Sequence, residues 1–252
     1  MGRMRQNRDQ KWFEKLEATE RIELAKAKMP NLLGHFLYLL ELHANNTHVV
    51  YSSLLSGQIP QSFAANAFNV FQRSMHQFEI VRLCALWDRA QAEKVNIPTV
   101  IELIGDDKII DMLADEARKP WVNEATVLND ADMKRSELEF ADEQAAKARS
   151  ELKEALAEAR EILASPRLTS VMNLRDKHLA HSLERTKRET HGLIAPMKYG
   201  DETAVLEQSV PIIERLYCWV SGASFSIGDT RRIDEENATS LWQACKFDPN
   251  MD

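Results

Sequence analysis

ADMKRSELEFADEQAAKARSELKEALAEAREIL, residues 131–163, is the stretch that decides the fold class of this chain. It contains no Gly or Pro, and more than half of it is Ala, Glu and Lys, which favour helices. Its apolar positions alternate in steps of three and four, the spacing of a seam that packs on a second helix. These positions are Leu138, Ala141, Ala145, Ala148, Leu152, Ala155, Ala159 and Ile162. We therefore expect a long helix in close contact with a partner helix, either in the same chain or in a second copy.

The composition of the whole chain also favours helices. Its 252 residues include only 8 Gly and 8 Pro, few for a many-stranded sheet with frequent turns. The hydrophobic fraction of 44% and the charged fraction of 28% are typical of a globular protein. The net charge of -7 argues against nucleic-acid binding by bulk charge. A local basic patch that binds RNA stays compatible with that charge.

Cysteine usage and hydropathy predict a cytoplasmic protein without membrane association. Cys84, Cys218 and Cys245 are far apart, odd in number and outside any CxxC pair, which is typical of free thiols in a reducing compartment. No apolar run approaches the roughly 20 residues of a membrane span. The basic, polar N-terminal stretch lacks the apolar core of a secretory signal.

Hydrophobic periodicity and chain-breaking residues predict further helices along the chain. The expected elements are a charged helix over 10–29 that ends at Pro30, an apolar helix over 32–44, a long helix over 61–94, two short helices within 97–118, a connector over 120–129, a core helix over 202–226 kinked or restarted at Pro211, and a final helix around 238–246. The fold is therefore predicted to be all-α. Its expected parts are an N-terminal amphipathic helix (1–30), a helical domain (31–228) and a C-terminal tail (229–252).

A further helix is predicted to begin at Ser165-Pro166 and to span 166–190, because Ser is a good N-cap and Pro fits the first turn. It contains the densest polar run in the chain, RDKHLAHS, residues 175–182. Each residue of an α-helix turns the chain by about 100°. Arg175, His178 and His181 are therefore expected along one stripe, with Asp176 projecting elsewhere.

This polar run permits three interpretations. It is a solvated helix face whose cations suit the C-terminal end of the helix dipole. Or His178, His181 and Glu184 bind a metal, although Arg175 and Lys177 would repel a cation. Or it performs phosphodiester chemistry without a metal, in which an imidazole takes the proton of an RNA 2′-hydroxyl while a guanidinium holds the phosphate. The charges of the run disfavour the metal, so we expect no metal and no cofactor.

MNLRDKHLAHS, residues 172–182, resembles the signature of the HEPN superfamily (higher eukaryotes and prokaryotes nucleotide-binding domains), in which Arg and a polar residue precede a His. More narrowly, it is similar to the AbiU-like group named from abortive-infection systems. FEIVRLCALWDRAQ, residues 78–91, resembles the long core helix of that group. The resemblance implies that Arg82, Asp88 and Arg89 lie near the signature.

The resemblance implies a HEPN-type helical bundle, with the 131–163 helix as a hairpin or arm, that forms a homodimer with its signature helices facing each other. It implies metal-independent endoribonuclease activity that leaves a 2′,3′-cyclic phosphate, in a defence or toxin–antitoxin context with a neutralising antitoxin protein. Arg175 and His181 would be catalytic, and Asp176 would orient them. Positions expected to contact RNA are Lys177, His178, Arg185, Lys187 and Arg188. The alternative is a non-catalytic nucleotide- or RNA-binding protein, or a dimeric helical interaction protein.

Overall fold

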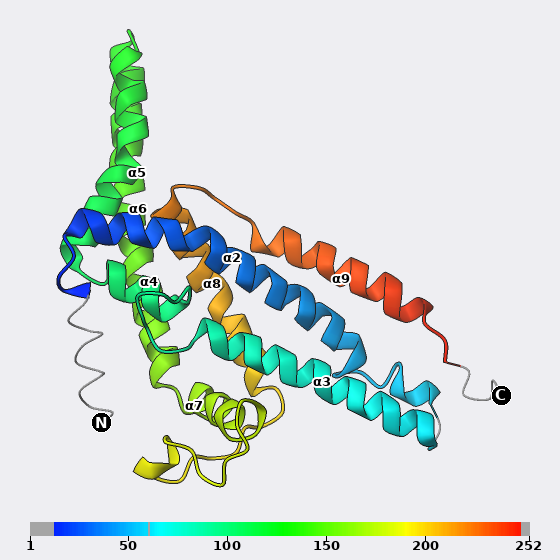
Figure 1. Cartoon of the computed structure of the whole chain (residues 1–252). Helices are drawn as coiled ribbons and strands as arrows, with labels where there is room; N and C mark the ends of the chain where they lie inside the picture. The colour runs from blue at the N-terminus through cyan, green and yellow to red at the C-terminus, as the bar shows by residue number, and fades with distance from the viewer. Residues whose placement is uncertain (1–12, 60, 248–252) are drawn as a thin grey trace. The chain divides into compact units, whose positions relative to one another are not determined.

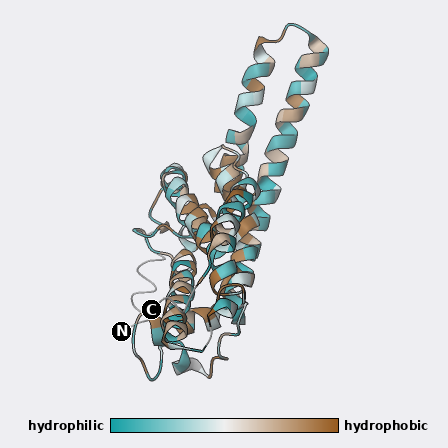
Figure 2. Cartoon of the chain, turned by 90° about the vertical axis from the view of Figure 1, so that its right-hand side faces the viewer, coloured by the Kyte–Doolittle hydropathy of each residue, from teal (hydrophilic) through white to brown (hydrophobic). Residues whose placement is uncertain are grey.

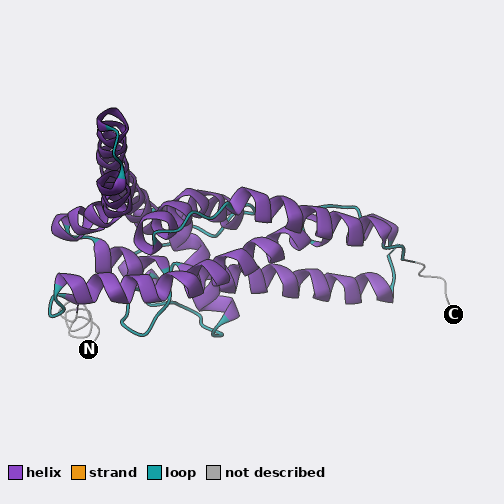
Figure 3. Cartoon of the chain, turned by 90° about the horizontal axis from the view of Figure 1, so that it is seen from above, coloured by secondary structure: helices purple, strands orange, loops and turns teal. Residues whose placement is uncertain are grey.

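The computed structural model describes residues 13–59 and 61–247, and within these ranges it contains helices and no strand (Figures 1 and 3). The predicted all-α fold is confirmed. Among the described residues, no helix combines the length and the apolar character that crossing a membrane requires. Trp12 and the other residues of the expected 10–29 helix before Phe13 lie outside the described residues.

The chain divides into two compact units, each assembled from three stretches of sequence. The first unit holds the described parts of Met1–Leu33, Trp87–Ser165 and Glu207–Phe225, and the second holds those of Gly34–Leu86, Pro166–Leu206 and Ser226–Asp252. Two of the five divisions fall within helices, one in α2 (Ala18–Val49) and one in α8 (Asp201–Ser221). The predicted division into 1–30, 31–228 and 229–252 stays a prediction.

A helical hairpin dominates the first unit. It consists of α5 (Asp107–Val127) and α6 (Ala131–Ala164), which lie side by side in Figure 2. Figure 2 shows hydrophilic residues along the outward surfaces of both helices. The antiparallel register follows from three ion pairs, since partners rise along α6 as they fall along α5: Arg118–Asp142, Arg149–Asp111 and Lys153–Asp107.

The small-residue seam predicted for α6 is the face that this helix buries. Of its eight positions, all but Leu138 are buried, and Ala148 packs with Ala114 of α5 and Ala145. Alanines at these positions permit a close approach of the two helix axes because they carry no bulk beyond Cβ. The partner helix belongs to the same chain.

Polar side chains fix the helix starts in this unit. Asn96 caps α4 (Ile97–Ile104) by accepting the Thr99 N–H, Asp106 caps α5, and Asp130 caps α6. Such caps pair backbone donors that have no partner within the helix. At the end of α4, Arg21 donates to the backbone carbonyls of Glu102 and Leu103, which pairs acceptors in the same way.

The second unit carries the signature segment. Its helices, besides the end of α2 and the start of α8, are α3 (Phe63–Leu86), α7 (Pro166–Leu174) and α9 (Ile227–Ala244), with a short 3₁₀ turn at Ser56–Gln58. Its core is formed by buried apolar residues of these helices. They include Phe36, Leu39, Leu40, Ile80, Leu83, Cys84, Leu168, Val171, Met172, Val205, Leu206, Ile227 and Ala238.

Three prolines lie inside helices, so several predicted boundaries are wrong. Pro30 does not end a helix but lies within α2, Pro120 lies within α5, and Pro211 lies within α8. The expected helices 10–29 and 32–44 are thus joined in α2, and α5 runs through most of the expected connector. A helical proline lacks the N–H that pairs with a carbonyl four residues earlier. Pro30 and Pro120 are exposed, where water can bind that carbonyl.

Two other helices differ from prediction at their ends. The long helix expected over 61–94 is α3, which stops at Leu86. The final helix expected around 238–246 begins earlier, at Ile227, where Ser226 caps it by accepting the Asp229 N–H. The periodicity located both helices, but propensity signals locate helix ends poorly.

Candidate functional site

The signature segment is not one helix. The α-helix that begins at Pro166 ends at Leu174, and residues Arg175–Leu179 form a π-helical turn in which the Ala180 N–H donates to the Arg175 carbonyl at 2.8 Å. The chain after Ala180 is irregular until a 3₁₀ turn at Glu189–His191. The prediction of a helix over 166–190 is therefore wrong. Single π turns are rare in proteins, and many of those that do occur lie at functional sites.

The π turn changes which side chains share a direction. Arg175 and His178 lie within the turn, whereas His181 follows it in irregular chain. The constant 100° step that placed all three along one stripe does not hold through this segment. Both imidazoles are on exposed residues. They are thus open to solvent on the segment that carries the guanidinium of Arg175.

Asp176 joins two arginines. Its Oδ1 accepts from Nε and Nη2 of Arg175, at 2.9 and 2.6 Å. Its Oδ2 accepts from Nε of Arg188, at 3.2 Å. Arg188 comes from the irregular chain twelve residues further on, so this carboxylate links the π turn to the basic stretch that follows it. Hydrogen bonds between ionised groups are among the stronger ones in proteins.

Glu189 is a second carboxylate that organises the segment. It accepts from the Thr186 N–H at 2.8 Å, from Nζ of Lys177 at 2.9 Å and from the Asn173 amide at 3.2 Å, while its own carbonyl accepts from Arg185 at 2.7 Å. The Thr186 backbone donor, followed by Lys177 and Asn173, lowers the pKa of Glu189 to about 2. The irregular chain is therefore held back against the end of α7.

Asn173 and Thr186 form a buried hydrogen bond beneath these contacts of Glu189. The Thr186 hydroxyl donates to Oδ1 of Asn173, and both residues are buried. Sequence reasoning missed Asn173, Thr186 and Glu189. Their contacts with Asn173 and Lys177 join residues 12 to 16 positions apart, which no local spacing signals. Only the reciprocal pairing of Thr186 with Glu189, three residues apart, has the local Thr-x-x-Glu spacing of a capping box.

The segment concentrates positive charge in an acidic protein. Between residues 175 and 189 there are five Lys and Arg residues and three Asp and Glu residues, whereas the whole chain has a net charge of -7. The cations are Arg175, Lys177, Arg185, Lys187 and Arg188, and the histidines are His178 and His181. Such a set offers charged donors for a phosphate and imidazoles for proton transfer.

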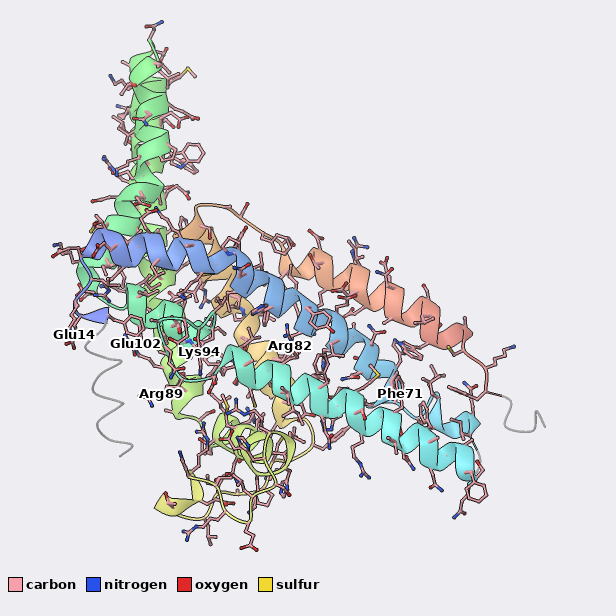
Figure 4. The ribbon with its side chains drawn as sticks, in the orientation of Figure 1. Glu14, Phe71, Arg82, Arg89, Lys94 and Glu102 are labelled. Atoms are coloured by element: carbon pink, nitrogen blue, oxygen red, sulfur yellow. The ribbon has the colours of Figure 1, made fainter. Side chains whose placement is uncertain are left out.

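The second stretch of the resemblance lies on α3 and beyond it. Arg82 is on α3, and its guanidinium lies over the ring of Tyr38 on α2, 5.0 Å from the ring centroid. Figure 4 labels Arg82 and Phe71 along α3, and Arg89 after it. Asp88 forms an ion pair with Lys94 at 2.7 Å. Asp88 and Arg89 belong to the first unit, so their expected proximity to the signature stays a prediction.

The α3 helix itself does contact the signature. It packs against both α7 and the π turn within the second unit. This agrees with the expected pairing of the 78–91 helix and the signature helix, for the part of that stretch that lies on α3.

Comparison with known proteins identifies one family. The family model for HEPN_AbiU2, described as AbiU2, matches residues 21–240. This range covers most of the chain and includes both stretches that carry the resemblance, 78–91 and 172–182. No curated protein and no solved structure matches the chain.

Proposed function

The chain belongs to the AbiU2 family of HEPN proteins, and on that basis we propose that it is a metal-independent endoribonuclease. We place it in the cytoplasm, in a defence or toxin–antitoxin setting, with a neutralising antitoxin protein as an expected partner. The observation that carries the proposal is the ordered basic segment itself. Asp176 fixes Arg175, and the exposed His181 follows six residues later.

The proposed reaction needs one base and one fixed cation. His181 takes the proton of an RNA 2′-hydroxyl, whose oxygen then attacks the adjacent phosphorus. The bond between phosphorus and the 5′-oxygen breaks, the leaving oxygen takes up a proton from water, and a 2′,3′-cyclic phosphate remains. Arg175 stabilises the negative charge that develops on the phosphate, because a guanidinium stays charged and donates several hydrogen bonds. Asp176 positions that guanidinium.

The flanking cations are proposed to hold the RNA backbone. Lys177, Arg185, Lys187 and Arg188 supply positive charge along the segment, and His178 adds a further donor. Phosphate contacts position a nucleic acid without reading its sequence. Lys187 and Arg188 are exposed, and Arg188 is shared with Asp176. Affinity for RNA should therefore fall with salt.

The proposed homodimer has a candidate surface on α3. This helix exposes an apolar stripe that includes Phe63 at 93%, Val70 at 64%, Phe71 at 44% and Phe78 at 43%. Between Phe63 and Phe78, Arg73 is the only formally charged residue. Apolar patches of this kind usually mark interfaces. A second copy of this chain suits the stripe because two nearly uncharged faces meet without strong repulsion.

The test of the proposed function is cleavage of labelled RNA in EDTA. Wild type should yield fragments with 2′,3′-cyclic phosphate ends, and Arg175→Ala and His181→Ala should each lose activity by about 100-fold or more. Arg135→Ala, on the exposed surface of α6, is the matched control and should cleave like wild type. Intact RNA with wild type, or equal cleavage by the site variants, would contradict the proposal.

A second candidate is RNA or nucleotide binding without cleavage. It is favoured by the state of Arg175, whose side chain is 16% exposed and already engaged by Asp176. To hold a phosphate, the Arg175 guanidinium must release the Asp176 carboxylate or bind both groups at once. Binding of RNA that Arg175→Ala weakens, with no turnover by wild type, would select this function.

A further inference from the structure

A second cluster of titratable side chains lies in the second unit. Its centre is Tyr51, in the connection after α2. The Tyr51 hydroxyl lies 3.0 Å from Oε2 of Glu79 on α3 and 3.2 Å from Oε1 of Glu202 in the first turn of α8. Glu79 and Glu202 expose only 1% and 0% of their surface. Two carboxylates at this depth need partners, because an unpaired buried charge is very costly.

Each carboxylate has its own histidine. Nδ1 of His43 on α2 lies 2.6 Å from Oε1 of Glu79, and Nε2 of His76 on α3 lies 3.0 Å from Oε1 of Glu202. The ring centroids of His43 and His76 lie 5.6 and 5.9 Å from that of Tyr51. We call His43, Tyr51, His76, Glu79 and Glu202 the Tyr51 centre.

The charge of this centre depends on its two imidazoles. Burial, and then the charges of Glu79 and Glu202, raise the pKa of Tyr51, so the phenol stays neutral. Burial acts to raise the pKa of Glu202, but hydrogen bonds from His76 and its other partners outweigh it, and the pKa lies below its ordinary value. With both carboxylates ionised, the centre carries two negative charges when both imidazoles are neutral, and none when both are protonated.

The hydrogen bonds of the Tyr51 centre also depend on the protonation of its two carboxyl groups. Tyr51 has one proton and can donate it to only one carboxylate at a time. The Asn46 amide and the Gly200 N–H also donate to the carboxylates, Asn46 to Glu79 and Gly200 to Glu202. A protonated carboxyl group would place a donor against these donors. The hydrogen bonds of the centre are therefore best satisfied when both carboxylates are ionised.

The Tyr51 centre also holds the end of the chain segment that leads away from the signature. Residues 193–198 have no regular secondary structure and connect the Glu189–His191 turn to α8. At their end, the ring centroid of Tyr199 lies 5.4 Å from that of Tyr51 and 6.2 Å from that of His76. The Tyr199 hydroxyl donates to the Val50 carbonyl at 3.4 Å, and the Gly200 N–H donates to Glu202 at 3.1 Å.

We propose that the Tyr51 centre is a proton-dependent latch on the 192–200 segment. Charged imidazoles balance the buried carboxylates and keep Tyr199 and Gly200 in place. When the imidazoles lose their protons, the buried negative charges are left without compensation, and the segment loosens. The titratable groups that face the centre from all packed elements are His43, Tyr51, His76, Glu79, Tyr199 and Glu202. The latch does not depend on RNA cleavage.

Hydrogen exchange of the full chain at pH 6 and pH 8, corrected for the intrinsic rate at each pH, tests the latch. In wild type, protection of the peptide over 198–204 should fall about tenfold more than that of a peptide from α6 between the two pH values. In a His43→Gln/His76→Gln variant, that extra loss should disappear. An equal pH response in wild type and variant, or none in wild type, would overturn the proposal.

Two further variants keep the test decisive if the double variant does not fold. Glu202→Gln preserves the shape of the side chain but removes one negative charge, so the pH response should shrink by at least half. Tyr51→Phe keeps the ring and removes the bridging hydroxyl, so protection over 198–204 should fall at both pH values. A full pH response in Glu202→Gln would contradict the latch.

Discussion

The guanidinium of Arg175 donates through both Nε and Nη2 to one oxygen of Asp176, at 2.9 and 2.6 Å. Neighbours in an α-helix do not face each other, so this pairing of adjacent residues is notable, and it occurs where the helix widens into a π turn. The second oxygen of Asp176 holds Arg188. Asp176 thereby fixes the positions of two cations of the proposed RNA site.

Replacing Asp176 with Asn should slow cleavage without abolishing RNA binding. Asn keeps one acceptor oxygen but loses the charge that holds both Arg175 and Arg188. We expect kcat to fall about 10- to 100-fold, with KM unchanged or lower because a repulsive charge has gone. Steady-state kinetics on a short labelled RNA measures both. Glu184→Gln removes the same charge from an exposed position and should stay within twofold of wild type, and equal loss in both variants would contradict the positioning role.

The two histidines of the signature should separate in their effects. His181→Ala removes the proposed base, whereas His178→Ala removes only a contact to the RNA backbone. We therefore expect His178→Ala to raise KM by less than about tenfold and His181→Ala to reduce kcat by about 100-fold or more. Kinetics of the two variants at fixed salt decides the matter. If His178→Ala instead shows the larger loss of kcat, the two roles are reversed.

Glu189 should hold the irregular chain after the π turn. Its pKa is lowered to about 2, so its stabilising contribution is present above the ordinary carboxyl range and is lost as the pH falls towards 2. Acidification from pH 7 to pH 5 should therefore leave the 180–192 segment unchanged. Glu189→Gln, by contrast, should make this segment several times more sensitive to limited proteolysis at pH 7. The exposed Glu184→Gln is the control, and equal sensitivity of both variants would contradict the role of Glu189.

The sequence predicted the long α6 helix of the hairpin well because its signal is periodic and local, whereas it placed the end of α5 too early. The spacing of alanines in 131–163 identified seven of the eight seam positions as buried, and a helix that repeats one face over many turns has few alternatives. The start of α7 at Pro166 was also predicted, since proline at the first helical position needs no hydrogen-bond donor.

Local periodicity could not predict the π turn or the path of the chain that follows it. Their shape depends on Glu189 and Thr186, which bond back to Lys177 and Asn173 across more than ten residues. The prolines within helices misled for a related reason. Local propensity predicts that a helix ends at Pro30. Met29 and Leu32, which flank this proline, are both fully buried, and their packing stabilises a helix that runs through it. Tertiary packing overrides propensity in both cases.

Ala148→Leu should destabilise the hairpin in the first unit. Ala148 is fully buried and packs with Ala114 and Ala145, so a larger side chain must force α5 and α6 apart. Overpacking of this kind costs about 1–3 kcal/mol. Denaturant unfolding should show this loss, whereas Ala146→Leu, on the exposed side of α6, should lie within about 0.5 kcal/mol of wild type. Equal free energies of unfolding for the two variants would contradict this prediction, because they would show that the contact between α5 and α6 accommodates a leucine.

Phe71→Asp should weaken self-association through α3. The change places a charge on both copies of the apolar stripe, so two like charges meet wherever the stripes pair. We expect sedimentation equilibrium to show wild type as a dimer and the variant with a dissociation constant at least tenfold higher, while circular dichroism stays unchanged because Phe71 is already 44% exposed. Asn69→Asp adds the same charge to an exposed, uncharged position of α3 outside the stripe and is the matched control. A monomeric wild type, or a variant that dimerises as tightly as wild type, would remove α3 as the dimer surface, and RNA cleavage by such a monomer would show that the site does not need a second copy.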